Sequence, residues 1–262
     1  MLKEKTNGGS DMKKAVVVGC GRLGKTIAEA LAGGAVNGVE LAGVYNRTFE
    51  KTKQVAEELS VHAVETFEEL LNMKPDYVVE AASPLTVKEI AVPVLKAGAD
   101  LLVLSTGAFS DSEFYENVQC AAEENDGHVY LVPGAVGGFD ILQAATMSGE
   151  AETTFNLQKF SSTSGRTDGI TTDIMDFFDG TVEELYRRAP SHLNVSVSTA
   201  LASNGMQNTK AKVKTGDGMN FTIECEGEFG KALIRTEMAK GSKLIAYSAV
   251  SVLKKLNQRI TF

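Results

Sequence analysis

Apolar runs of strand length alternate with helical patterns along the first half of the chain. The apolar runs lie at 15–18, 40–45, 77–80, 101–104 and 129–132. The helical patterns between them lie at 23–32, 49–59, 84–96 and 114–124. Strands that are separated by helices predict a parallel, doubly wound sheet, so we expect an α/β domain of Rossmann type over residues 12–137.

The pattern changes near Gly138. Alternating and β-branched segments at 153–160 and 208–225 predict strands, and 182–188 and 195–202 carry helical patterns. We therefore expect a smaller α+β domain over 138–240, which would hold the substrate and the catalytic groups.

The two ends of the chain differ in character. Residues 1–11 are polar and include an Asn-Gly-Gly-Ser stretch, which predicts a disordered leader or tag remnant. Residues 241–262 begin with an amphipathic helix, in which we expect Leu244, Ala249, Val252 and Leu256 to face inward.

The first predicted strand runs directly into Gly19-Cys20-Gly21-Arg22-Leu23-Gly24. A Gly-x-Gly-x-x-Gly string between a strand and a helix is typical of a dinucleotide-binding turn. Gly19 allows the tight turn, Gly21 lets the backbone approach a pyrophosphate, and Gly24 lets the helix sit close to the strand. Arg22 and Leu23 bring free N–H groups to the pyrophosphate at the positive end of the helix. The alternative is a tight turn that holds no ligand.

The end of the second predicted strand indicates which dinucleotide is bound. NAD-binding proteins place a carboxylate there for the ribose 2′-hydroxyl, whereas this chain has Asn46, Arg47 and Thr48. Arg47 can bind a 2′-phosphate and Thr48 can donate its hydroxyl, so we expect NADP, with NAD as the alternative. Arg47 could also be a solvated side chain or stack on the adenine of either cofactor. Ala82 and Ser83 follow the next strand and are expected at the same edge of the sheet.

Composition narrows the class of protein. The chain has 262 residues and a net charge of −8, which argues against a general nucleic-acid-binding protein. No apolar run reaches the length of a membrane span. The sequence contains 3 cysteines without a Cys-x-x-Cys spacing, which is typical of the reducing cytoplasm. We expect a cytoplasmic enzyme without a metal site that forms a homodimer through an apolar face of the second-domain sheet.

Several strings taken together resemble the small NAD(P)-dependent L-aspartate dehydrogenases. They are Glu80-Ala81-Ala82-Ser83-Pro84, Ser105-Thr106-Gly107-Ala108-Phe109, Pro133-Gly134-Ala135-Val136-Gly137-Gly138-Phe139-Asp140, Ala189-Pro190-Ser191-His192-Leu193-Asn194-Val195 and Tyr247-Ser248-Ala249-Val250-Ser251-Val252-Leu253. They occur in the order and spacing of that family. The resemblance implies oxidative deamination of aspartate to iminosuccinate and then to oxaloacetate and ammonia, or the reverse reaction. It also implies that the last helix returns to the first domain.

The resemblance also implies particular contacts with the nicotinamide. The family's contacts match Ala135 and Asn194 here. Ala135 would present backbone at a strand end without an obstructing side chain, and the Asn194 amide can donate and accept at once. The alternatives are a packing role for Ala135 and a helix N-cap role for Asn194.

One departure from the family concerns its catalytic histidine. To within one residue, because the alignment contains a gap, the matching position is Thr222, which cannot act as a base near neutral pH. His192 lies two residues before Asn194 and is the alternative group for proton transfer, unless it faces solvent. Lys159 and Arg166 are the cations that we expect to hold a small anionic amino, keto or imino acid, although both could be ordinary surface charges.

Three functions therefore remain open from the sequence. The first is an aspartate dehydrogenase-like oxidoreductase that prefers NADP. The second is an imine or carbonyl reductase on the same scaffold, which needs no histidine base. The third is a non-catalytic NADP sensor that has lost the base.

Overall fold

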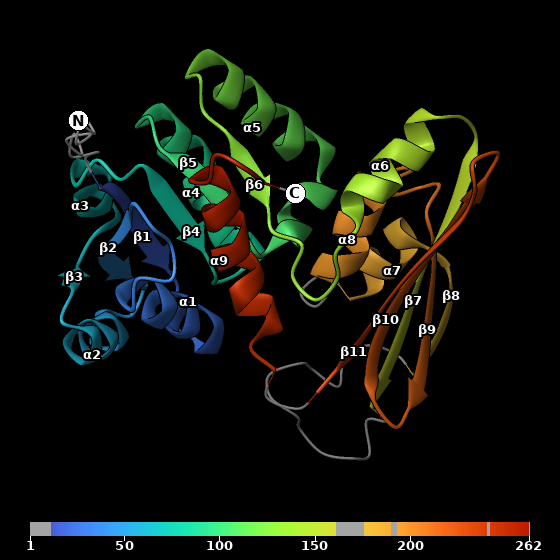
Figure 1. Ribbon diagram of the computed structural model, residues 1–262, viewed down its shortest axis with the longest axis horizontal. Helices are drawn as coiled ribbons and strands as arrows, with labels where there is room; N and C mark the ends of the chain where they lie inside the picture. The colour runs from blue at the N-terminus through green and yellow to red at the C-terminus, as the bar shows by residue number, and fades with distance from the viewer. Residues whose placement is uncertain (1–11, 161–175, 190–192, 240–241, 262) are drawn as a thin grey trace, which may run out of the picture.

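A computed structural model of the chain describes residues 12–160, 176–189, 193–239 and 242–261. Two sheets lie side by side, each with its own helices, and the helix near the C-terminus lies between them (Figure 1). Among the described residues, no helix combines the length and the apolar character that a bilayer crossing requires.

The first sheet contains six parallel strands in the order β3-β2-β1-β4-β5-β6. Its strands are β1 (Lys13–Val18), β2 (Val39–Tyr45), β3 (His62–Val64), β4 (Tyr77–Glu80), β5 (Asp100–Val103) and β6 (Val129–Leu131). Its helices are α1 (Arg22–Ala32), α2 (Phe49–Leu59), α3 (Phe67–Asn72), α4 (Pro84–Lys96), the 3-10 helix η1 (Thr106–Ser110) and α5 (Ser112–Glu124). The strand order reverses between β1 and β4, which is the place where such sheets bind dinucleotides. The predicted Rossmann fold is confirmed.

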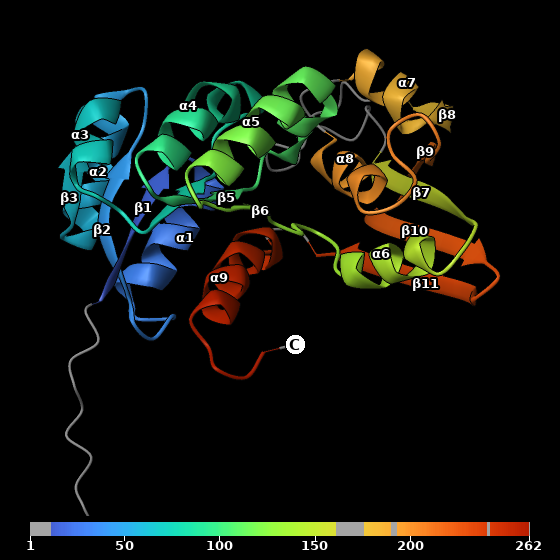
Figure 2. The same cartoon turned by 90° about the horizontal axis from the view of Figure 1, so that it is seen from above.

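Alternate residues of β1 supply the two faces of this sheet. Ala15 and Val17 pack with α1, and Val16 and Val18 pack with α4 and α5. Figure 2 shows the same arrangement, with α4 and α5 on one side of the sheet and α1 on the other. Because both faces are covered, the buried part of a central strand is a continuous apolar run, as in Ala15-Val16-Val17-Val18 of β1.

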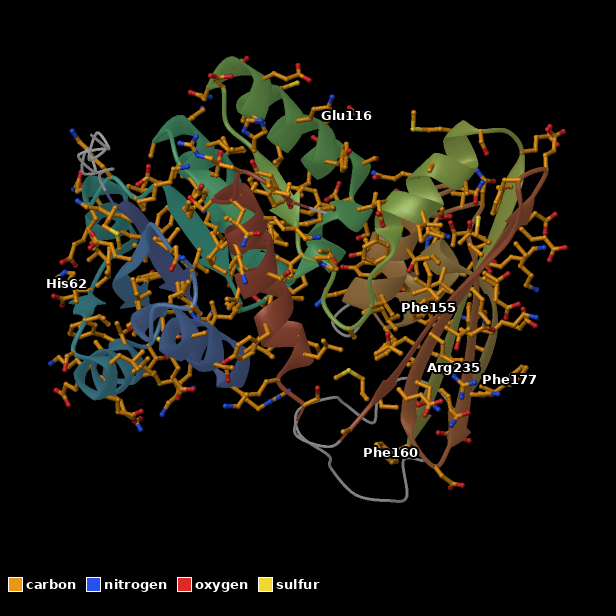
Figure 3. All side chains as sticks on the ribbon, in the orientation of Figure 1. His62, Glu116, Phe155, Phe160, Phe177 and Arg235 are labelled. Carbon is orange, nitrogen blue, oxygen red and sulfur yellow. The ribbon has the colours of Figure 1, made fainter. Side chains whose placement is uncertain are left out.

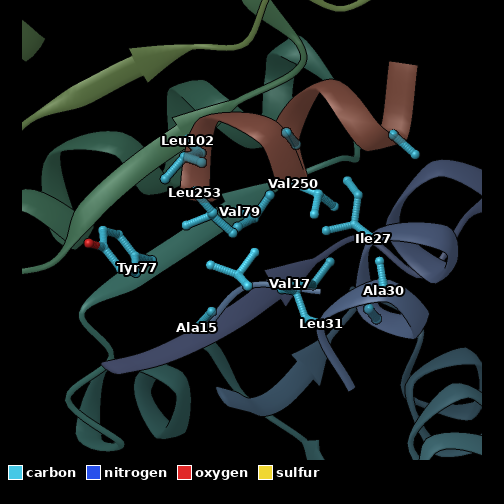
Figure 4. Packing of buried hydrophobic residues seen from close by; sticks show 14 of the residues in the cluster. Ala15, Val17, Ile27, Ala30, Leu31, Tyr77, Val79, Leu102, Val250 and Leu253 are labelled. Carbon is cyan, nitrogen blue, oxygen red and sulfur yellow. The ribbon is translucent and has the colours of Figure 1, made fainter. Parts of the chain in front are cut away.

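The helix α9 (Leu244–Leu256) packs beside α1 on the first sheet. Its buried residues Ala246, Ala249, Val250 and Leu253 contact the cluster around Val17, Ile27 and Val79 (Figure 4). The expectation that Leu244 faces inward was wrong, because this side chain is 46% exposed. Leu244 precedes Ala246 by two residues, which places it about 200° around the helix, on the opposite side.

The second sheet has the order β11-β10-β7-β9-β8 and mixes parallel and antiparallel pairs. Its elements are α6 (Phe139–Met147), β7 (Ala151–Phe160), β8 (Phe177–Thr181), α7 (Val182–Arg188), α8 (Asn194–Leu201), β9 (Lys210–Gly216), β10 (Met219–Gly227) and β11 (Gly230–Met238). The three helices pack on one face of the sheet, which we call the inner face. The predicted α+β character of this domain is confirmed.

The outer face of the second sheet differs from the apolar face that the sequence led us to expect. It carries polar and charged side chains, among them Asn156, Thr222, Lys212 and Arg235. The exposed large apolar residues on this face are Phe177, at 74% exposure, and Leu233, at 60%. Phe177 and Arg235 lie on the side away from the first domain, whereas Phe155 lies toward it (Figure 3).

Candidate active site

The turn between β1 and α1 has the geometry that its glycines predict. Gly19 has a φ of +107°, and a Cβ there would lie 2.6 Å from the Ala81 carbonyl oxygen. A Cβ on Gly24 would overlap the Gly19 carbonyl oxygen, so only glycine lets α1 approach the strand. A Cβ on Gly21 would meet no atom within 4 Å, which leaves open space above this part of the turn.

The N-terminus of α1 fits a pyrophosphate. Gly21 is the N-cap residue and supplies no side chain, and the first turn of α1 contains no acidic residue. The first backbone bond that closes the helix runs from the Lys25 N–H to the Gly21 carbonyl. The N–H groups of the first turn are therefore free for an anion, next to the open space at Gly21.

The segment after β2 lies against this turn. Asn46 Oδ1 accepts a hydrogen bond from the Cys20 N–H at 3.2 Å, and the Asn46 N–H donates to the buried Thr52 hydroxyl at 3.0 Å. Asn46 therefore fixes the loop, while Arg47 and Thr48 are exposed at its tip. Within the described residues, the Arg47 guanidinium forms no ion pair.

A cleft of about 250 Å³ runs from the α1 turn to the inner face of the second sheet. On the first-domain side it is lined by Arg22, Leu23, Ala82, Ser105 and Ala135, which follow the carboxyl ends of the parallel strands. On the other side it is lined by residues of β7, β10 and α8, namely Phe155, Leu157, Phe221, Asn194 and Ser198. The cleft therefore joins the glycine-rich β1–α1 turn to a wall whose β7 and β10 residues are apolar.

Glu80, the last residue of β4, is a fully buried carboxylate behind this cleft. Its Oε1 accepts hydrogen bonds from the Ala82 N–H at 2.7 Å and from the Ser105 hydroxyl at 2.8 Å. Its Oε2 accepts from the Ser105 N–H at 3.0 Å. Burial raises the pKa of the Glu80 carboxyl above its usual range, against the lowering effect of these donors. Glu80 thereby ties together the segments that leave β4 and β5.

Hydrogen bonds join the two domains beside the cleft. The Thr106 hydroxyl donates to the Asn194 carbonyl at 2.9 Å, and the Gly107 N–H donates to Asn194 Oδ1 at 3.0 Å. The Ser198 hydroxyl donates to Thr106 Oγ1 at 2.9 Å. Asn194 is the first residue of α8, whose N-cap is Leu193, so the alternative of an N-cap role for the Asn194 side chain is not what the structure shows.

Thr222 does not lie in the cleft. Alternate residues of a strand point to opposite faces, and in β10 it is Phe221 and Ile223 that belong to the inner core. Thr222 points to the outer face and lines a separate hollow with Asn156 and Arg235. We therefore correct the expected placement of Thr222 at the site: the residue of this pair that faces the cleft is Phe221, whose ring centroid lies 6.4 Å from that of Phe155.

The remaining predicted site residues are only partly brought together. Ser83 caps α4 by accepting a hydrogen bond from the Thr86 N–H at 3.1 Å, and it is not among the residues that line the cleft. Lys159 is buried on the inner-face side of β7, where its ammonium lies 3.2 Å from Asp176 Oδ1. His192 and Arg166 lie outside the described residues.

Other ionisable groups lie away from the cleft. His62 is exposed at the edge of the first domain and pairs with Glu69 at 2.7 Å (Figure 3). His128 lies 3.5 Å from Asp100 and is also exposed. In the described part of the chain, no group of His, Cys, Asp and Glu side chains could hold a metal ion.

Sequence reasoning missed Glu80 and Phe221 as site residues, and it assigned Ser105 no role of its own. Glu80 ends the apolar run Tyr77-Val78-Val79, and a charge at the carboxyl end of a buried strand was a signal for it. Ser105 lies just after the next strand, two residues beyond Val103, which pairs with Glu80. The signal for Phe221 was the alternation of apolar and polar residues in Met219-Asn220-Phe221-Thr222-Ile223, which places Phe221 on the buried face of the strand and Thr222 on the opposite face.

Comparison with known proteins matches each half of the chain to a protein-family model. Residues 19–132 match the family model described as Homoserine dehydrogenase, NAD binding domain, and residues 140–258 match Aspartate dehydrogenase, C-terminal. The crystal structure of aspartate dehydrogenase from Thermotoga maritima is similar with a TM-score of 0.75 at 23% identity, and the match covers 95% of this chain and 99% of that chain. At this level of identity the likeness shows the fold.

Sequence relatives carry the assignment further. The chain is 30% identical to an L-aspartate dehydrogenase from Methanococcus maripaludis, over 95% of this chain and 98% of the relative. It is 32% identical to an L-aspartate dehydrogenase from Archaeoglobus fulgidus, over 92% of this chain and 97% of the relative. This protein, an NAD(P)-dependent dehydrogenase with an N-terminal NAD-binding domain, therefore belongs to the L-aspartate dehydrogenase family.

Proposed function

We propose that the protein catalyses the oxidative deamination of a small amino acid, with aspartate as the first candidate, or the reverse reductive amination. Aspartate would give iminosuccinate, which water converts to oxaloacetate and ammonia. The observation that carries this proposal is that one continuous cleft joins the α1 turn to Ala135 and Asn194. A protein that only sensed the dinucleotide would not need a second domain that closes the nicotinamide end.

The cofactor proposal is a preference for NADP over NAD. A nicotinamide dinucleotide supplies, when bound, a carbon that accepts or donates a hydride. The first turn of α1 would hold its pyrophosphate, and Arg47 and Thr48 at the exposed tip after β2 would hold a 2′-phosphate. Fixing of this loop by Asn46 supports the proposal, because it presents Arg47 close to the α1 turn without a competing ion pair among the described residues.

At the nicotinamide end, the chain's own residues position and shield the reactants. Asn194 Oδ1 is fixed by the Gly107 N–H, which orients the amide NH₂ group as a donor. Ala135 is buried and has a side chain too small to block a ring. Phe155, Leu157 and Phe221 form a wall that excludes water from the reacting carbon.

Lys159 and Arg166 are proposed to bind the carboxylates of the substrate, and His192 is proposed to take part in proton transfer. The buried position of Lys159 on the inner-face side of β7, in line with Phe155 and Leu157, supports its part in this proposal. Its ion pair with Asp176 would have to open for a substrate carboxylate to replace it.

A second candidate function is the reduction of an imine or carbonyl whose side chain is apolar. The observation in its favour is Phe221, which presents an aromatic ring to the cleft beside Phe155. An apolar surface of this kind solvates a carboxylate poorly.

One assay separates these functions. Reduction of NADP and of NAD is measured with a panel of amino acids at alkaline pH, and the reverse reaction is measured with oxaloacetate plus ammonia. Turnover of aspartate supports the first function. Turnover of apolar amino or keto acids without aspartate supports the second, and tight NADP binding without any turnover would contradict both.

We also propose a homodimer that forms through the outer face of the second sheet. The exposed Phe177 and Leu233 on this face, and the nearby opposite charges of Lys212 and Glu224, support it. Sedimentation of the wild type and of a Leu233→Glu variant tests the proposal, since a dimer through this face should dissociate in the variant. A monomeric wild type would contradict it.

A further inference from the structure

The hydroxyl groups that line the cleft differ in where their hydrogen bonds end. The Ser196 hydroxyl donates to the Leu193 carbonyl at 2.8 Å. The Ser198 hydroxyl donates to Thr106, whose own hydroxyl donates to the Asn194 carbonyl. Backbone carbonyls cannot take up a proton near neutral pH, so these hydroxyls only position the chain.

Ser105 is the exception among these hydroxyls. Its Oγ lies 2.8 Å from Oε1 of Glu80, so this hydrogen bond ends on a group that can bind a proton. Ser105 itself lines the cleft, whereas Glu80 is fully buried behind it. Among the described residues that line the cleft, Arg22 is the one charged side chain, and its guanidinium does not release a proton in proteins.

We propose that Ser105 and Glu80 form a proton relay, in which the Ser105 hydroxyl exchanges protons with the substrate and Glu80 stores the proton. The proposal rests on the proposed dehydrogenase function. In the direction of deamination, an N–H bond of the substrate ammonium group breaks and its proton passes to Ser105 Oγ. The original Ser105 hydroxyl proton passes at the same time to Glu80 Oε1. Two protons move in concert, with the net transfer of one proton from substrate to Glu80, and no electron is transferred in this step. When product leaves, Glu80 passes its proton back through Ser105 to water in the cleft.

The surroundings of Glu80 suit this task. Its neighbours in the sheet are Val18 of β1 and Val103 of β5, and neither carries a charge. The titratable group on the β1–α1 turn is the Cys20 thiol, whose pKa is raised by burial and lowered by Thr52 and Lys51. These partners place the thiol toward the segment after β2 and not toward Glu80. Burial is the largest influence on Glu80 and raises its pKa toward the range in which a general base works well.

The relay remains compatible with the other hydrogen bonds of Glu80. Each carboxyl oxygen has two acceptor positions, so a protonated Oε1 can still accept from the Ala82 N–H while it donates to Ser105 Oγ. Oε2 keeps the bond from the Ser105 N–H in both states. Proton transfer therefore requires only that the hydroxyl of Ser105 reverses its direction.

Ser105→Ala tests the relay because it removes the hydroxyl and keeps the backbone bond to Glu80 Oε2. We expect kcat to fall about 100-fold or more, as for the loss of a general acid or base. We also expect the limb of the kcat/KM pH profile that reports the ionisation of Glu80 to disappear, while the Kd for NADPH stays within a factor of about two, a change worth only ~0.4 kcal/mol. Ser198→Ala is the matched control, since both serines are 6% exposed and line the cleft but Ser198 bonds to Thr106. Its pH profile should keep that limb.

Two further measurements separate the failure of the relay from other outcomes. Infrared spectra of the cofactor-free protein across the pH range should show a buried carboxylic acid band that Glu80→Gln removes, whatever the substrate is. The relay would be overturned if Ser105→Ala keeps both the wild-type kcat and the limb of the kcat/KM pH profile assigned to Glu80. It would also be overturned if the spectra show that Glu80 never binds a proton. Either result would leave the dehydrogenase function itself intact if the wild type deaminates amino acids. If that limb of the kcat/KM pH profile disappears in His192→Ala but persists in Ser105→Ala, proton transfer belongs to His192 instead.

Discussion

Phe221 and Thr222 are consecutive in β10, yet Phe221 faces the cleft and Thr222 faces the outer side of the second sheet. A one-residue shift along a strand exchanges its two faces completely. The side chain that β10 presents to the cleft at this point is therefore the aromatic ring of Phe221 and not the hydroxyl of Thr222. Together with Phe155 and Leu157, this ring makes the second-domain wall of the cleft apolar.

Introduction of histidine at each of the two positions tests this facing. Phe221→His should add a limb near pH ~6.5 to the kcat profile, because an imidazole in the cleft titrates there. Thr222→His should leave the profile unchanged, since its ring would lie on the outer face. A new limb in Thr222→His and none in Phe221→His would contradict the assigned facing of β10.

The glycines of the α1 turn should respond differently to alanine. Gly21→Ala should leave the melting temperature near that of wild type, because a Cβ there meets no atom within 4 Å. It should nevertheless weaken dinucleotide binding tenfold or more, a loss of about 1.4 kcal/mol or more. Gly24→Ala should instead lower the melting temperature, since its Cβ would overlap the Gly19 carbonyl oxygen. Fluorescence titration with NADPH and thermal unfolding measure the two effects, and equal NADPH affinity in Gly21→Ala would refute the binding role.

Arg47 should distinguish the two dinucleotides. Arg47→Ala should weaken NADP binding about 10- to 100-fold, the value of a hydrogen bond to a charged group, and should change NAD binding little. Lys53→Ala is the control, because Lys53 is an exposed cation on α2 whose ammonium lies over the Phe49 ring. Equal losses for NADP and NAD in Arg47→Ala would remove the case for a 2′-phosphate contact.

Glu80 should also influence how stability depends on pH. Because burial raises its folded-state pKa above 4.5, the folded state binds more protons than the unfolded state between the two values. Stability from this group is therefore lost as the pH rises from the pKa of the unfolded state through the higher pKa of the folded state. As the pH increases over that window, the melting temperature of wild type should accordingly fall relative to that of Glu80→Gln. A difference that is constant with pH would show that Glu80 keeps its charge throughout.

Much of the first domain could be predicted from the sequence, because each of its signals is local. Ala15–Val18 of β1 and Tyr77–Val79 of β4 are continuous apolar runs, and the glycine string around Gly21 follows the first of them directly. The three-residue strand β3 was too short to show a pattern. The helix α6 was also missed, since it begins directly after the glycine-rich string that ends at Gly138.

The catalytic end of the site was predicted less well, because it depends on contacts between distant parts of the chain. Asn194 and Ala135 could be predicted as site residues only from the resemblance to a family. Glu80 and Ser105 are separated by 25 residues, and their hydrogen bond exists only because β4 and β5 are neighbours in the sheet. The facing of Phe221 was within reach of the sequence, because Met219, Phe221, Ile223 and Cys225 alternate with polar residues along β10, but its position opposite Leu157 depends on the pairing of β10 with β7.

The two crossings between the domains lie next to each other in space. The chain leaves the first domain after β6 and returns to it before α9, and the Gly134 N–H on the outgoing segment donates to the Ser248 hydroxyl on α9 at 3.1 Å. Because the second domain is connected to the first at two adjoining points, a hinge rotation about these points is the motion that the connections allow, rather than a shear of one domain along the other. Opening of the cleft would thus be a rotation about the segments at Gly134 and Ser248, and it would break the hydrogen bonds that join Thr106 and Gly107 to Asn194.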